Sequence, residues 1–82
     1  MNKQQSTRGA INDGVITARV RAALAADPVT ASYEIRVETL NGIVELTGFV
    51  ETTSVRVEAL HVAEYVDGVL RVDDLLDLRK FE

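Results

Sequence analysis

The stretch that decides the fold is residues 33–50, YEIRVETLNGIVELTGFV. Apolar and polar residues alternate on both sides of Asn41-Gly42, which is typical of half-buried β-strands. Asn-Gly is the strongest short-range hairpin signal, because both central residues of a type I′ turn need a positive φ. We therefore predict antiparallel strands over residues 33–40 and 43–50, joined by this turn.

The turn also determines which side chains share a face of the hairpin. Pairing Leu40 with Ile43 places one apolar set on the face that we expect to pack under helices. This inner set is Ile35, Val37, Val44 and Leu46, and the outer set is Arg36, Glu38, Leu40, Ile43, Glu45, Thr47 and Phe49. The outer face is a candidate partner interface through Leu40, Ile43 and Phe49. The alternative to an interface is a solvent-exposed sheet face with scattered apolar residues, which is common.

A helical apolar period precedes the hairpin. Ile16, Val20 and Leu24 form one stripe with Ala23, which predicts a helix over residues 13–26. Asn12 or Asp13 can cap its first amides, and Asp27-Pro28 stops it.

A second helix is predicted to begin near Ser54 and to end at Asp67-Gly68, where Gly68 can take a left-handed conformation. Its apolar stripe is Val55, Ala59, Val62, Ala63 and Val66. Alternation returns over residues 69–78, predicting a third strand reached by a right-handed crossover.

The predicted fold class is therefore α+β, a single small α-β-β-α-β domain with a mixed three-stranded sheet and both helices on one face. Residues 1–12 are expected to form a flexible N-terminal arm, residues 13–78 the folded domain, and residues 79–82 a charged tail. With 82 residues, there is room for one core only.

Composition excludes several function classes. The chain has no Cys, which removes thiolate metal sites and cysteine nucleophiles. No stretch of 18 apolar residues predicts a membrane span, and no apolar run follows Lys3 as in a signal peptide. We therefore expect a cytoplasmic protein or one whose targeting segment has been removed.

Charge is distributed unevenly along the chain. The formal net charge is −4, which opposes binding to nucleic acid or to an anionic membrane on average. Residues 1–21 nevertheless hold four basic residues against Asp13 alone, a balance of +3, whereas the remainder has a balance of −7. The basic residues of that segment are Lys3, Arg8, Arg19 and Arg21. We expect any anion to be contacted there.

The motif residues together resemble the BON domain, the bacterial osmotically-inducible and nodulation-associated module. The most specific parts are Asn41-Gly42-x-Val44-x-Leu46-x-Gly48 and Val66-x-Gly68-Val69-x-x-Val72. The resemblance covers about residues 13–78. Asp74 stands where the family often has Asn, which bears on the hydrogen bonding of the third strand.

The resemblance implies a non-enzymatic module of the bacterial envelope, periplasmic or associated with the outer membrane, that binds phospholipid. It implies no cofactor and no catalytic residues. The matching residues are structural: Asn41 and Gly42 serve the turn, Gly68 the helix end, and Gly48 a bulge or a close approach to a helix. Together with the charge balance, the resemblance makes Arg8, Arg19 and Arg21 the candidate lipid-binding residues, with Lys3 assisting.

The sequence gives little support to acid–base catalysis or to metal binding. His61, the only histidine, lies between Glu58 and Glu64, which could orient a general base, but a solvated surface histidine is far commoner. Asp73 and Asp77 could bind a hard cation weakly, although alternation sends Asp74 to the opposite face and a charged strand edge is the better interpretation.

A nucleic-acid partner is not expected, because the chain is acidic, lacks a G-x-x-G loop and has few aromatic residues. The main alternative to an anionic phospholipid partner is a protein partner, or self-association, through the outer sheet face.

Overall fold

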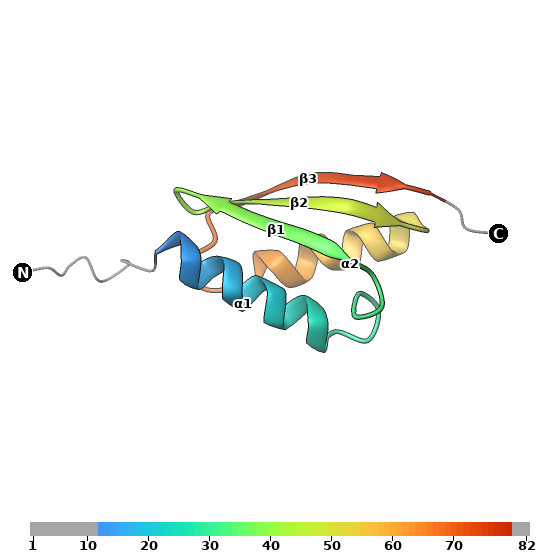
Figure 1. Cartoon of the computed structure of the whole chain (residues 1–82), viewed down its shortest axis with the longest axis horizontal. Coiled ribbons are helices and arrows are strands. Elements are labelled where there is room, and N and C mark those ends of the chain that lie inside the picture. The colour runs from blue at the N-terminus through green and yellow to red at the C-terminus, as the bar shows by residue number, and fades with distance from the viewer. Residues whose placement is uncertain (1–11, 80–82) are drawn as a thin grey trace, which may run out of the picture.

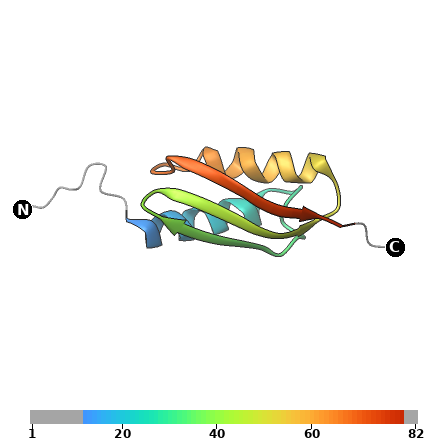
Figure 2. The same ribbon diagram turned by 90° about the horizontal axis from the view of Figure 1, so that it is seen from above.

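The computed structural model describes residues 12–79, and these form two layers, a sheet and a pair of helices (Figure 1). The elements are α1 (Asp13–Ala26), β1 (Ile35–Leu40), β2 (Ile43–Val50), α2 (Thr53–Glu64) and β3 (Arg71–Leu78). The strand order is β1-β2-β3, with β1 antiparallel and β3 parallel to β2. Both helices cover the same face of the sheet (Figures 1 and 2). The predicted fold class is confirmed.

The hairpin forms in the predicted register. Leu40 pairs with Ile43, and the two turn residues Asn41 and Gly42 have φ values of 53° and 82°. Gly42 can hold this conformation without strain because it has no Cβ. The turn therefore determines which residues of β1 and β2 face the helices.

The core lies between the inner sheet face and the two helices. Its buried hydrophobic residues are Ile16, Val20, Leu24, Val37, Val44, Leu46, Val50, Val55, Ala59, Ala63 and Leu76. Both alanines of α2 are fully buried, so the small side chains let this helix lie close to the sheet. The apolar stripes predicted for both helices face this core.

The start and end of α2 differ from prediction. The helix begins at Thr53, because the Thr52 side chain accepts the Val55 N–H at 3.2 Å and serves as N-cap in place of Ser54. It ends at Glu64, and Gly68, with φ 96°, lies in the turn that follows. The left-handed residue therefore shapes the connection to β3 and does not terminate the helix.

Two strands are shorter than predicted. Tyr33 lies outside β1, because its N–H donates to the Thr30 carbonyl at 3.0 Å in the turns that precede the strand. Leu70 lies outside β3, because its N–H donates to the Gly42 carbonyl at 2.8 Å, at the hairpin end. A local turn before β1 and a long-range contact before β3 thus displaced boundaries that alternation alone had placed two residues earlier.

Gly48 lies close to the backbone just before β1 and forms neither a bulge nor a close approach to a helix, so both alternatives predicted for it are wrong. Its φ is 131°, and a Cβ at this position would lie 2.7 Å from the Glu34 carbonyl oxygen. Pairing continues through Gly48 opposite Ile35, so no bulge interrupts the ladder there. The glycine is needed because the neighbouring backbone occupies the space of a side chain.

Candidate binding surfaces

The first candidate surface is the solvent side of α1. Ile16, Val20 and Leu24 turn toward the core, and the opposite side is exposed. We call it the α1 face, and its exposed residues are Gly14, Val15, Ala18, Arg19, Arg21, Ala22, Ala25 and Ala26. With 100° between successive residues, Ala18 and Ala22 lie near its middle and the two arginines near its opposite margins. The surface is therefore small and apolar with basic borders.

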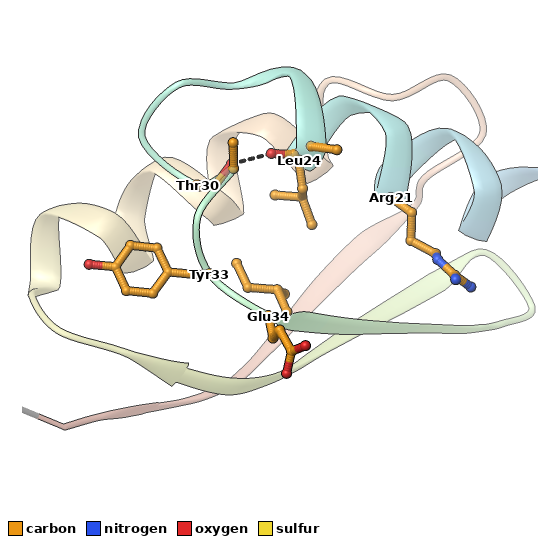
Figure 3. A pocket seen from close by; sticks show the side chains of 8 residues that line it. Arg21, Leu24, Thr30, Tyr33 and Glu34 are labelled. Carbon is orange, nitrogen blue, oxygen red and sulfur yellow. Dashed lines mark hydrogen bonds between the residues drawn. The ribbon is translucent and has the colours of Figure 1, made fainter. Parts of the chain in front are cut away.

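The structure does not bring Arg19 and Arg21 together. Arg21 lines a shallow hollow between α1 and the segment leading into β1, whereas Arg19 does not contribute to that hollow. In Figure 3 the Arg21 side chain stands at one side of the hollow and Tyr33 at the other. The two arginines can contact a surface together, but they cannot clamp one phosphate. Lys3 and Arg8 lie outside the described residues.

The hollow beside Arg21 is built by a tightly bonded loop. The buried Thr30 hydroxyl donates to the Leu24 carbonyl at 2.7 Å (Figure 3), which holds the loop against the end of α1. The Tyr33 hydroxyl donates to a Glu51 carboxylate oxygen at 3.3 Å. Partial burial, together with the nearby Glu51 charge, raises the pKa of Tyr33. These contacts hold the loop against α1 and against the end of β2.

The second candidate surface is the outer sheet face. Leu40 is 71% exposed and lies directly across from the half-buried Ile43. Phe49 lies at the other end of β2, six residues and about 20 Å from Ile43, and the Arg79 guanidinium covers its ring at 4.1 Å. The predicted interface trio is therefore one apolar pair at the hairpin end and a separate aromatic residue.

An acidic row separates those apolar positions. Glu38, Glu45 and Asp73 are cross-strand neighbours on β1, β2 and β3. Arg71 pairs with Asp73 at 2.9 Å, which raises the pKa of the Arg71 guanidinium. Within residues 12–79, no group of three or more His, Cys, Asp or Glu side chains is arranged to hold a metal ion. The acidic row thus separates the Leu40–Ile43 pair from Phe49 on the outer sheet face.

A third feature is an open groove between the C-terminal halves of the helices, lined in part by Asp27, Glu58 and His61. A hydrogen bond to Asp27 and the charge of that carboxylate raise the pKa of Glu58, while His61 opposes the shift. The same hydrogen bond lowers the pKa of Asp27. His61 is exposed, as predicted, and no Ser, Thr or Lys side chain lines the groove with it.

Asp13 and Arg56 make long-range contacts that sequence reasoning missed. Asp13 at the start of α1 accepts the N–H groups of Asn41 and Gly42 at 2.8 and 3.0 Å, linking the helix to the hairpin turn. Arg56 on α2 pairs with Asp74 on β3 at 3.2 Å. Neither spacing gives a signal in the sequence, because the partners lie far apart along the chain.

Comparison with known proteins defines the class. The BON domain family model matches residues 12–80, which include all of the described residues, and the observed α-β-β-α-β order is the one that the family resemblance implied. The chain belongs to the BON domain family. Neither helix of residues 12–79 has the length and apolar character that a membrane-spanning segment requires.

The chain is also similar to a characterised bacterial protein. Over 70 residues the chain is 36% identical to osmotically-inducible protein Y of Escherichia coli strain K12. This match covers 85% of the chain and 35% of the relative. The chain thus spans about a third of the relative's length.

Proposed function

We propose that this chain is a non-enzymatic binding module of the bacterial envelope that makes weak, peripheral contact with anionic phospholipid through the α1 face. The BON family and the osmotically-inducible relative support an envelope protein linked to osmotic stress. The main support for a lipid contact at this face is the charge and amino-acid composition of α1.

Among the described elements, α1 alone has a positive balance. It holds Arg19 and Arg21 against Asp13, whereas β1 is neutral and β2, α2 and β3 are negative. Asp13 is engaged by the hairpin amides, and no acidic residue occurs over 14–26. The exposed charge of the helix is therefore basic.

The apolar part of the α1 face suits shallow contact with headgroups. Alanines and the 38% exposed Val15 lie between the arginines, so the helix can approach a surface without burying a charge. The apolar area is small, and each basic residue near an anionic surface contributes roughly 1 kcal/mol. Residues 12–79 hold six basic and twelve acidic side chains, which oppose any other orientation. Binding should therefore be weak, oriented and lost at high salt.

Vesicle flotation tests the proposal. We expect the wild-type chain to float with anionic vesicles at low salt, not with zwitterionic vesicles, and the variant with Arg19→Glu and Arg21→Glu to lose this binding. The matched control carries Arg36→Glu and Arg79→Glu on the outer sheet face, the same change in charge, and should retain most of it. Equal loss in both variants, or no flotation of the wild type, would reject the α1 face.

A protein partner at the hairpin end is the second candidate. Leu40 and Leu70 are 71% and 78% exposed, and Leu70 packs next to Gly42, which brings both to the hairpin end with Ile43. Exposed apolar clusters of this kind mark protein contacts. Leu40→Ser should abolish capture of such a partner without affecting flotation, so that a protein contact and a lipid contact are distinguished.

A further inference from the structure

β3 is an edge strand whose outer side faces no other strand of the described chain. In a parallel ladder, alternate residues direct both backbone groups toward the neighbouring strand. The Arg79 N–H donates to the Val50 carbonyl of β2 at 2.8 Å, so residues an even number of positions before Arg79 face β2. Leu76, three positions before it, therefore directs its N–H and carbonyl away from the sheet.

Both outward groups of Leu76 are occupied by side chains. Asp74 Oδ1 accepts the Leu76 N–H at 3.0 Å, and Arg56 Nη1 donates to the Leu76 carbonyl at 3.4 Å. The two side chains are themselves paired, with Arg56 Nε 3.2 Å from Asp74 Oδ2. One ion pair between α2 and β3 thus occupies the two outward hydrogen-bonding groups of Leu76, which an added strand would need.

We propose that Arg56 and Asp74 block the β3 edge by occupying the outward N–H and carbonyl of Leu76, and that, when these groups are freed, the edge pairs with the same edge of a second copy of this chain. Exposed strand edges promote such pairing, and charged side chains are a common means of preventing it. The Arg56 and Asp74 side chains are 32% and 28% exposed. Substituting either residue removes the ion pair.

The charges along β3 favour a second copy in an antiparallel register centred on residue 74. In that register Arg71 of each copy lies opposite Asp77 of the other and Val72 lies opposite Leu76, which matches opposite charges and apolar residues, whereas Asp73 lies opposite Leu75. The outward-facing residues of both strands are then those that exchange hydrogen bonds. Asp74 would meet its own copy at the centre, which gives the wild type a second barrier.

Sedimentation equilibrium of Asp74→Ala tests this proposal. This variant removes the cap on the Leu76 N–H and the central like charge, and we expect its mass to rise with concentration toward twice that of the monomer. Asp74→Asn is the key comparison, because its side-chain carbonyl still accepts the Leu76 N–H; it should remain monomeric, as should the wild type. Asp73→Ala, from the neighbouring ion pair on the outer face, is the matched control and should also remain monomeric.

Hydrogen exchange locates any association. The Leu76 amide should be protected in the wild type, exchange faster in dilute Asp74→Ala, and regain protection at high concentration. Arg56→Ala, which frees only the carbonyl, should associate more weakly and serves if Asp74→Ala fails to fold. A folded Asp74→Ala that stays monomeric, or association of Asp74→Asn or Asp73→Ala to the same extent, would overturn the proposal.

Discussion

At the scale of single residues, the structure depends on side chains that satisfy backbone groups far along the chain. Asp13 is the leading example, because one carboxylate accepts both N–H groups of the hairpin turn. Charge-assisted hydrogen bonds of this kind contribute more than neutral ones. The Asn-Gly turn therefore has a local cause in its φ values and a distant support in α1.

Asp13→Ala should lower the free energy of unfolding by about 1–3 kcal/mol, since two amides lose a charged acceptor. Urea denaturation of both proteins measures the difference. Glu64→Ala, which removes an exposed carboxylate of α2, should change stability by less than about 0.5 kcal/mol. If the two variants lost the same amount, the link between α1 and the turn would have no energetic role.

Gly48→Ala should be more harmful than an ordinary glycine substitution. The new Cβ would meet the Glu34 carbonyl oxygen at 2.7 Å, and φ is 131°, so the backbone must shift at a cost of about 1–3 kcal/mol. Gly14→Ala is the contrast, because its Cβ would meet only the Asn12 side chain at 3.4 Å and alanine favours helix by about 1 kcal/mol. Thermal melts should therefore move in opposite directions; a harmless Gly48→Ala would contradict the close approach.

At the scale of elements, the sequence predicted what local chemistry determines and missed what distant contacts determine. The β1–β2 register was predictable because turn and alternation specify it together. The start of α2 was not, since Thr52, Thr53 and Ser54 are all suitable caps.

For the candidate surfaces too, the sequence predicted local features and missed contacts between distant residues. The periodicity of α1 correctly put Arg19 and Arg21 on different sides of the helix, but the Arg79–Phe49 contact and the Arg56–Asp74 pair depend on how strands and helices meet in space. Alternation did place Asp74 on the opposite face from Asp73 and Asp77, as the structure confirms through its contact with α2. It could not show which residue would pair with it.

The two helices are coupled through the Asp27–Glu58 pair, which predicts a pH effect. Because the pKa of Glu58 is raised in the folded state, its contribution stabilises the fold below its unfolded pKa and is lost as pH rises through the folded value. Above that value two carboxylates face each other, while the pKa of Asp27 is lowered and works in the opposite direction at more acidic pH.

Glu58→Gln should therefore stabilise the domain at neutral pH, since the amide can donate to Asp27 at every pH. Unfolding curves from pH 4 to 7 should show a smaller loss of stability with rising pH than in the wild type. Glu64→Gln on the same helix should leave that pH dependence unchanged. An identical pH profile for the wild type and Glu58→Gln would mean that the two carboxyl groups do not interact.

At the scale of the whole molecule, the fold separates three surfaces with different chemistry. The α1 face is small, apolar and basic at its borders; the outer sheet face is divided by an acidic row; and the β3 edge is closed by an ion pair. Because both helices cover one side of the sheet (Figure 2), a membrane at the α1 face would leave the outer sheet face directed elsewhere. Lipid and protein contacts would thus not compete.

The central claim is that lipid is contacted through the α1 face. Its most direct test is a residue-resolved NMR titration of the chain with anionic bicelles at low salt, with zwitterionic bicelles as the control. We predict that the amide signals of Val15, Arg19 and Ala22 shift and broaden with anionic lipid, while those of Glu45 and Asp73 on the outer sheet face stay unchanged. Perturbations centred on the outer sheet face, or equal responses to both lipids, would contradict the account.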